Sequence, residues 1–307
     1  MKRVKLGNQS MLYPYPVTIV TTVIEGKKNF MQVGFSGIVN ANPGMVSLGI
    51  SKTHFTTNGL EEGNVIGLSL ADESMLIKAD YVGLRSGHKV DKSDVFKTFT
   101  GDYGAELIEE APINLELEII KVLDLGGVDN IIISEIKEVH AKETVMTGKF
   151  PDIEKINPLV FSMYENKYFR IGDQVGSGWR DGLKYEHLKS FVLEIFKGFD
   201  VLADIDTYLK HVSDSSKFDF AGQVFEGIEG FKTWYQGVNK QLLKEGIQHH
   251  VTNFDVKKLG ELYQVDFDVR FIASTKNGQK IDDLIHERWL VRDDETFIIE
   301  DYKTELV

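Results

Sequence analysis

The 307-residue sequence contains no cysteine. This absence excludes disulfide bonds, thiolate metal sites, iron–sulfur clusters and a cysteine nucleophile. If the protein handles electrons, they must sit on a bound organic cofactor or on a metal with non-thiolate ligands.

Long apolar runs are also missing. No segment approaches the roughly 18 consecutive apolar residues that a membrane helix needs. The basic start Met1–Arg3 is followed by polar residues and prolines, so it does not predict a secretory signal. We therefore expect a soluble, cytoplasmic protein.

Positive charge is scarce, with 35 Lys and Arg against 47 Asp and Glu and a formal net charge of −12 at pH 7. When the chain is divided at residue 187, both halves are acidic. A nucleic-acid backbone or an anionic membrane surface would require a basic face on its partner. We expect neither nucleic acid nor membrane as a partner.

Short apolar and β-branched segments dominate the first half of the chain. Residues 17–24 and 29–38 flank the polar Glu25–Lys28, which predicts a β-hairpin. Further predicted strands are residues 45–50, 65–70, 113–123 and 130–139. The last two are expected to pair across a Gly-containing turn. Many short strands joined by such turns predict a barrel or sandwich, so the N-terminal fold is expected to be all-β-rich.

Helical periodicity begins at His187, and we therefore expect two domains, residues 1–187 and 188–307. Apolar residues recur at three- and four-residue steps over 188–210 and 227–244, which predicts two helices. Strands are predicted at 249–256, 262–274, 280–291 and 297–303. Apolar and polar residues alternate along 262–274, which indicates a sheet with one buried and one wet face.

Four pieces of the N-terminal half stand in a distinctive order: Asn29-Phe30-Met31, Asn42-Pro43, Ser51–Thr56 and Ser86–Lys92. Their order and spacing resemble the flavin reductase-like family of FMN-binding split barrels, which includes flavoredoxins. The resemblance covers residues 1–187. It implies a split barrel, an FMN cofactor, and a homodimer with the flavin near the subunit interface.

The segment after the run 45–50 has the chemistry of a phosphate site. FMN carries a phosphate with a charge between about −1.5 and −2, which hydroxyls, backbone N–H groups and cations bind well. By resemblance to the family, the phosphate contacts fall on Ser51, His54, Thr56 and Asn58. The alternative is an ordinary capping loop, where Ser and Thr are common.

The flavin ring needs an apolar floor and main-chain hydrogen-bonding groups along its edge. The resemblance places these on residues 29–35, with contacts from Asn29, Met31, Gln32 and Val33. The sequence departs at Gln32 and Gly34 from the Asn-Phe-Met-Thr-Ala-Ser-Trp common in the family, so main-chain contacts are expected there. The alternative is a core strand of the barrel.

The segment Ser86–Lys92 matches the family's Ser-Gly-Arg-Asp-Val-Asp-Lys closely, with His88 and Lys89 at the Arg-Asp positions. The resemblance places Ser86, Gly87, His88 and Lys89 beside the flavin. A cation there would favour the phosphate or an anionic reduced ring. The alternative is a solvated turn.

Residues 188–307, helices followed by a curved sheet, resemble the SnoaL-like branch of the NTF2-like α+β cone. Such domains enclose a small-molecule pocket or serve in dimerisation, and both alternatives stay open. The expected pocket residues are Trp234, Tyr235, His249, His286 and Asp301, with Asp219, His250, Glu287, Tyr263 and Trp289 as further candidates. A His–carboxylate pair such as His286 with Asp301 is a candidate for acid–base work, and the alternative is that these side chains are satisfied by other partners or face solvent. No metal site is expected, because the adjacent His249 and His250 point to opposite faces of a strand.

The expected chemistry is carried by the flavin, so no catalytic acid or base is assigned. No Gly-x-Gly-x-x-Gly follows a strand, so NAD(P)H would have to stack transiently on FMN. Three functions remain open: an NAD(P)H-dependent flavin reductase-like oxidoreductase, a flavoredoxin-type electron carrier, and a non-redox ligand-binding or scaffold protein with a degenerate flavin cleft. The sequence names neither the electron donor nor the acceptor.

Overall fold

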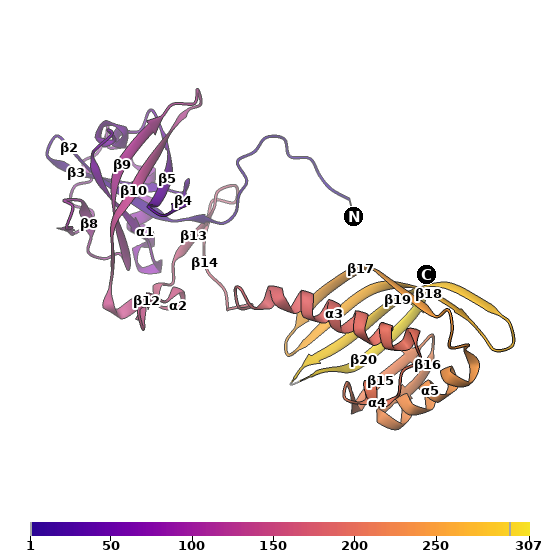
Figure 1. Cartoon of the computed structure of the whole chain (residues 1–307). Helices are drawn as coiled ribbons and strands as arrows, with labels where there is room; N and C mark the ends of the chain where they lie inside the picture. The colour runs from indigo at the N-terminus through magenta and orange to yellow at the C-terminus, as the bar shows by residue number, and fades with distance from the viewer. Residues whose placement is uncertain (1, 295) are drawn as a thin grey trace. The chain divides into compact units, whose positions relative to one another are not determined.

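The computed structural model describes residues 2–294 and 296–307 (Figure 1). The chain forms two compact units, Met1–Asp173 and Gln174–Val307. The boundary expected at residue 187 falls inside helix α3, Asp181–Asp200. The helical periodicity of the sequence places the boundary too far along the chain. The first buried residue of α3 is Leu188, so the first turns of the helix contribute no buried apolar residue to the pattern.

A seven-stranded antiparallel sheet forms the N-terminal unit, in the order β3-β2-β6-β9-β10-β5-β4. Its strands are β2 (Thr18–Ile24), β3 (Lys27–Val33), β4 (Ser36–Ala41), β5 (Gly44–Ser51), β6 (Val65–Leu70), β9 (Ile113–Leu123) and β10 (Asp129–Ala141). The predicted hairpin and the predicted β9–β10 pair are both confirmed. Asn42 and Pro43 form the turn between β4 and β5.

Shorter elements surround this sheet. The helical ones are η1 (Phe55–Gly59), η2 (Glu73–Met75), α1 (Leu76–Leu84), η3 (Glu143–Val145) and α2 (Ile153–Ile156). The strands are β1 (Tyr15–Pro16), β7 (Thr98–Thr100), β8 (Glu106–Ile108), β11 (Met146–Thr147), β12 (Phe150–Pro151), β13 (Leu159–Ser162) and β14 (Lys167–Arg170). Ala79 and Val82 of α1 pack with Phe30 and Phe96 in one apolar cluster. A second cluster, containing Leu48 and the other inward side chains of the large sheet, forms the centre of the unit.

A six-stranded mixed sheet forms the C-terminal unit, in the order β16-β15-β20-β19-β18-β17. Its strands are β15 (Val212–Phe220), β16 (Gln223–Glu226), β17 (Gln248–Leu259), β18 (Leu262–Ser274), β19 (Lys280–Asp293) and β20 (Phe297–Leu306). The last four confirm the predicted strands. The sequence patterns did not predict β15, which pairs in parallel with β20.

The same unit contains helices α3, α4 (Asp206–Leu209) and α5 (Gly227–Gln241) (Figure 1). The helix predicted to continue to residue 210 instead ends at Asp200. Leu202 adopts φ 44°, a left-handed conformation that a right-handed helix cannot contain. The predicted second helix is confirmed and ends at Gln241.

The core of the C-terminal unit lies between α3 and the sheet. Leu188 and Ile195 of α3 belong to the same buried cluster as Val265 and Phe267 of β18 and Trp289 of β19. The buried and partly exposed positions alternate along most of β18, as the sequence pattern predicted. In the described part of the chain, no helix combines the length and apolar character needed to cross a bilayer.

Candidate functional site

Three sequence-distant segments enclose a cavity of about 300 Å³ in the N-terminal unit. They are the turn and start of β3, the beginning of η1, and the loop 86–92. The lining includes Asn29, Phe55, Gly87, Lys89, Asp91 and Lys92. Three predicted site residues, Asn29, Gly87 and Lys89, are therefore brought to one cavity by the fold.

Asn29, which lines this cavity, forms a buried hydrogen bond with Thr56, which does not line it. The Asn29 amide donates to Thr56 Oγ1 over 2.8 Å, and the two residues are only 4% and 1% exposed. The bond ties β3 to η1 and satisfies a polar pair that would otherwise be costly to bury. These two predicted site residues thus hold the segment 54–59 against the sheet.

The exposed side of the segment 51–58 carries the other predicted phosphate groups. His54 and Asn58 are exposed, and Ser51 is half-buried with its hydroxyl 3.1 Å from Thr53 Oγ1. The Ser51 carbonyl accepts from the His54 N–H and from the Thr57 hydroxyl, both at 3.0 Å. This backbone anchoring leaves the His54 imidazole facing solvent.

Gly87 allows the loop 86–92 to lie directly against η1. A Cβ at this position would be 2.3 Å from Phe55 Cδ1 and 2.8 Å from Asn29 Oδ1. The His88 ring packs edge-on against the Phe55 ring, with centroids 5.1 Å apart. Ser86 Oγ accepts from the His88 N–H over 3.3 Å. Phe55, which the sequence analysis did not assign, is thus the side chain around which this corner is built.

The cations of the loop have different surroundings. Lys92 is 4% exposed and donates to the carbonyls of Val82 and Arg85, at 3.2 and 3.0 Å, beside the end of α1. Its burial lowers the pKa of the Lys92 ammonium to about 8. Asp91 pairs with Lys27 over 3.0 Å. Lys89 is exposed, and within residues 2–294 and 296–307 it forms no ion pair, so its charge is available to an anionic ligand.

The remaining predicted residues of β3 lie on two sides of the strand. Met31 and Val33 are 7% and 4% exposed and belong to the central apolar cluster. Gln32 Oε1 accepts from the Tyr168 hydroxyl at 3.1 Å, and that hydroxyl also lies 2.8 Å from Asp80 Oδ1. With their side chains in these positions, residues 31–33 have only main-chain groups to offer a ligand.

Comparison with known proteins identifies the N-terminal unit. The family described as "Flavin reductase like domain" matches residues 10–170, which is more than half of the chain. The chain belongs to the flavin reductase-like family. Three of the four segments that carry the sequence resemblance contribute residues to the lining of this cavity, and Asn42-Pro43 does not.

Two solved structures resemble this flavin reductase-like protein. Flavoredoxin from Methanosarcina acetivorans is 34% identical, with a TM-score of 0.57, over 59% of this chain and 98% of that chain. Flavoredoxin of Desulfovibrio vulgaris (Miyazaki F) is 26% identical, with a TM-score of 0.55, over 59% of this chain and 100% of that chain. A curated relative, an uncharacterized protein from Aeropyrum pernix, is 25% identical over 52% of this chain, and the match spans only 62% of that relative's length.

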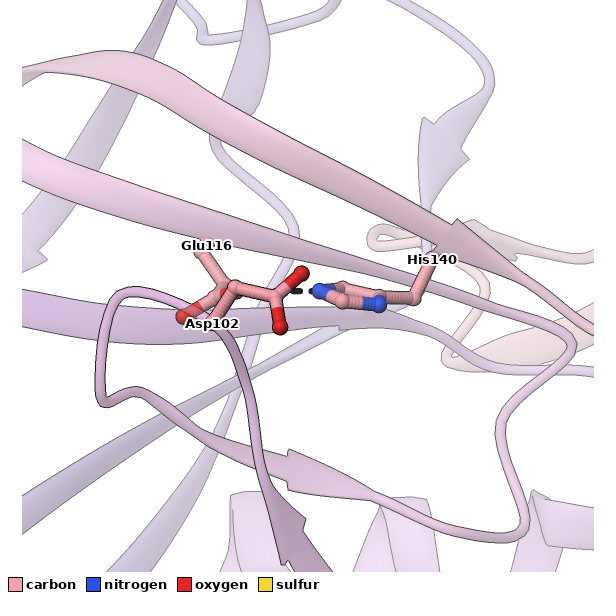
Figure 2. Close-up of side chains that lie close together, drawn as sticks. All are labelled: Asp102, Glu116 and His140. Atoms are coloured by element: carbon pink, nitrogen blue, oxygen red, sulfur yellow. Dashed lines mark hydrogen bonds and ion pairs between the residues drawn. The ribbon is translucent and has the colours of Figure 1, made fainter.

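A second polar group lies elsewhere in the N-terminal unit (Figure 2). Potential ligand atoms of Asp102, Glu116 and His140 all lie within 4.8 Å of one another. Glu116 is 0% exposed and accepts from the N–H groups of Tyr103 and Ala105, at 2.8 and 3.2 Å, and from His140 Nε2 at 2.9 Å. Burial raises the pKa of Glu116, but these bonds outweigh it and hold the pKa below its usual range.

These hydrogen bonds account for the grouping without a metal. The Glu116 carboxylate holds the loop 101–105, and a Cβ at Gly101 would lie 2.4 Å from it. This role of Glu116 was not predicted. Alternation along residues 113–118 puts Glu116 on the polar side of the strand with Asn114 and Glu118, so the sequence gives no cue to its burial.

The expected pair His286–Asp301 in the C-terminal unit is not formed. The register of β19 and β20 sets Leu290 opposite Asp301, whereas His286 lies opposite Glu305. His286 Nδ1 instead lies 2.8 Å from Asp268 Oδ1 on the neighbouring β18. The residue pattern of a single strand cannot predict how two strands are aligned, because this register depends on the turns and on packing between the strands.

A cavity of about 310 Å³ lies in the C-terminal unit, and Trp234, His249 and Glu287 line it. Tyr235, also predicted for this pocket, is 3% exposed in the core, with its hydroxyl donating to the Ala203 carbonyl. His250 is exposed and points away from His249, as alternation along a strand requires.

Proposed function

We propose that the protein is an FMN-binding flavoprotein that acts as an NAD(P)H-dependent flavin reductase-like oxidoreductase. One observation carries the proposal: the segments of β3, η1 and the loop 86–92 that resemble the family's flavin-binding segments border a single cavity. Membership of the flavin reductase-like family and 34% identity to a flavoredoxin support it.

The residues around the cavity fit an anionic ligand with a flat apolar part. The Lys89 ammonium lines the cavity and suits a phosphate group, and the His54 imidazole and the Ser51 hydroxyl, which do not line it, are carried by the segment that leads to Phe55. The Phe55 ring and the main chain of residues 29–33 suit the ring system. Gly87 keeps the loop close to Phe55, so that both surfaces meet the same ligand.

This chain would hold and orient the cofactor. When bound, FMN supplies the hydride and one-electron chemistry. Asn29 and Thr56 fix the position of η1, and Lys92 ties the last residue of the loop 86–92 back to the end of α1. The ion pair with Asp91 neutralises Lys27, whereas Lys89, which also lines the cavity and is in no ion pair among the described residues, is the cation that we assign to the phosphate.

An electron carrier is the second candidate function, favoured by the two flavoredoxins among the similar structures. The visible spectrum of the purified protein, taken anaerobically before and after NADH or NADPH, distinguishes the two. A yellow protein that either nucleotide bleaches rapidly is a reductase. A yellow protein bleached by dithionite but not by nucleotide is a carrier. A colourless protein that leaves the fluorescence of added FMN unquenched contradicts both and favours a non-redox ligand-binding or scaffold role.

Lys89→Ala tests the phosphate assignment. An exposed charge pair contributes about 1 kcal/mol, so we expect FMN to bind about 5-fold more weakly. Riboflavin lacks the phosphate, and its affinity should not change. Lys149→Ala, at an exposed lysine that does not line the cavity, is the matched control. An equal loss for FMN and riboflavin in a fluorescence titration would contradict the assignment of Lys89 to the phosphate.

We also propose that the protein is a homodimer. Strand β4 is an edge of the seven-stranded sheet, and its Ile38 and Val39 are 67% and 52% exposed. An exposed apolar edge strand is a surface that proteins usually cover. Light scattering should give the mass of two chains, and Ile38→Glu should give one. Leu125→Glu, at an exposed leucine in the turn after β9, should leave the dimer intact. A wild-type monomer at micromolar concentration contradicts the proposal.

For the C-terminal unit we propose an NTF2-like cone of the SnoaL-like branch. The order of helices followed by strands supports it, as does a cavity lined by both α3 and the sheet. An experimental structure of the full chain in which this sheet encloses no cavity would contradict the assignment.

A further inference from the structure

A second cavity of the C-terminal unit is separate from the one that Trp234 and His249 line. It has a volume of about 390 Å³ and is bordered by the first half of α3, by His211 just before β15, and by the turn between β19 and β20. The two cavities share no lining residue. The volume is within the range of small-molecule sites, about 300–1,000 Å³.

One stripe of α3 forms a wall of this second cavity. Its residues follow one another at steps of three and four, which places them on one face of the helix: Lys184, His187, Phe191 and Glu194. Phe191 is 6% exposed, whereas His187 and Glu194 are exposed. The wall therefore combines an apolar base with polar groups that solvent can reach.

Three rings, Phe191, His211 and Phe297, form an aromatic floor. The centroids of Phe191 and Phe297 are 5.3 Å apart, and the His211 ring packs edge-on against Phe191 with centroids 4.8 Å apart. Lys184 Nζ lies 5.9 Å from the centroid of Phe297. The face of an aromatic ring attracts a cation, so this floor already accommodates one ammonium group.

The His211 ring is held in one tautomer. Nδ1 lies 2.8 Å from the Phe297 carbonyl oxygen, which can only accept, so Nδ1 carries the proton and Nε2 is an acceptor. Among the residues that the structure describes, Nε2 has no hydrogen-bond partner. Burial lowers the pKa of His211, so the ring is neutral at pH 7. The cavity therefore contains an acceptor that only a donor can satisfy.

Carboxylates outnumber cations in the described lining of this cavity. Its one lysine, Lys184, stands against three acidic residues: Glu194, Asp293 and Asp294. Lys184 pairs with Asp293 over 2.5 Å, so these two charges neutralise each other. Glu194 forms no ion pair with any described residue, and its charge acts on His211, since it partly opposes the lowering of the pKa of that ring. The free carboxylate and the free imidazole acceptor are therefore close together.

We propose that this cavity binds a small organic molecule with a primary ammonium group and an aromatic body. The ammonium donates to the Glu194 carboxylate and to His211 Nε2, and the body packs on the aromatic floor. Both partners are acceptors, and an ammonium group has three donors and no acceptor. A neutral analogue lacks the charge-assisted hydrogen bond, and an anionic one is repelled by the carboxylates.

The test titrates the full-length protein with 2-phenylethylamine, an ammonium ion at about pH 7, in a calorimeter. 2-Phenylethanol has nearly the same shape without the charge, and phenylacetate reverses the charge. The amine should bind at least about 10-fold more tightly than the alcohol, because a hydrogen bond to a charged group is stronger by about that factor. Phenylacetate should not bind.

Glu194→Gln locates the site. It removes the charge and should weaken binding of the amine at least about 10-fold. Glu186→Gln, at an exposed glutamate of the same helix that does not line the cavity, is the matched control and should bind the amine as the wild type does. Both glutamates are exposed, so both variants should unfold at the wild-type urea concentration.

Three results would overturn the proposal. The first is a wild-type protein that does not bind 2-phenylethylamine. The second is an alcohol that binds as tightly as the amine, which would mean that the ammonium group is not recognised. The third is equal affinity of Glu194→Gln and Glu186→Gln for the amine, which would mean that the amine binds elsewhere on this acidic protein.

Discussion

Replacing Gly87 by alanine is a direct test of how the cavity of the N-terminal unit is built. Gly87 does not have a positive φ, so alanine is compatible with its backbone conformation. The added methyl would lie 2.3 Å from Phe55 Cδ1 and 2.8 Å from Asn29 Oδ1. The effect of the substitution is therefore steric and falls on two residues that line the cavity.

The size of the effect follows from these distances. Ordinary contact begins near 3.4 Å, so the Phe55 ring or the loop must move by about 1 Å. The His88 ring packs against the Phe55 ring, and Asn29 is buried and hydrogen-bonded to Thr56. Phe55 and Asn29 therefore cannot move freely away from the added methyl group. Overpacking of this kind costs about 1–3 kcal/mol. If the loop relieves the clash by moving, the same energy weakens FMN binding about 5- to 140-fold.

Two measurements separate these possibilities. Urea unfolding gives the loss of stability, and quenching of FMN fluorescence gives the change in affinity. Gly127→Ala is the matched control, because a Cβ added at Gly127 would meet no atom within 4 Å and this glycine does not have a positive φ. It should change neither quantity.

A double-mutant cycle identifies the clash itself. Phe55→Leu shortens the obstructing side chain, so Gly87→Ala should cost at least about 1 kcal/mol less in that background. Wild-type stability and wild-type FMN affinity in Gly87→Ala alone would refute the reasoning, since they would mean that the loop and η1 are not in contact in solution.

Two other buried charges give further predictions. Because burial disfavours protonated Lys92, the unfolded chain binds more protons between about pH 8 and its ordinary pKa of 10.5, and the free energy of unfolding should rise with pH across this window. Lys92→Met should lack this rise, as measured by urea unfolding at several pH values. Glu116→Gln should lower the free energy of unfolding by about 3 kcal/mol, because backbone donors lose their charged acceptor. His140→Gln keeps a donor and should cost less than about 1.5 kcal/mol. The Glu116 contribution should be lost as the pH falls below 4.5, because the folded-state pKa is lowered from that value.

Much of the fold follows from local patterns. Alternation along residues 262–274 and the β-branched run before Glu25 gave the right strands because each pattern matches the period of its element. The helix end at Asp200 and strand β15 were missed. Val212–Phe220 contains the polar run Ser213–Ser216, and it becomes a strand because β20, far along the chain, offers it a parallel edge.

Three residues that line the cavity of the N-terminal unit could be named from the sequence for a different reason. Asn29, Gly87 and Lys89 belong to motifs of fixed spacing, and the structure places them at one cavity. The His249–Asp200 pair joins residues 49 positions apart, on a helix end and a strand start. Such a pair depends on how α3 crosses the sheet, which no local pattern encodes.

The sequence alone determined which chemistry is available to this chain. It has no thiol, it has a formal net charge of −12 at pH 7, and it carries segments in a fixed order whose side chains suit a phosphate and a flat ring. The tertiary structure decided which polar groups are buried, and therefore which ones change their protonation. Lys92, Glu116 and Glu287 are ordinary charged residues in the sequence, and only the packing around each one sets its hydrogen bonds and its pKa.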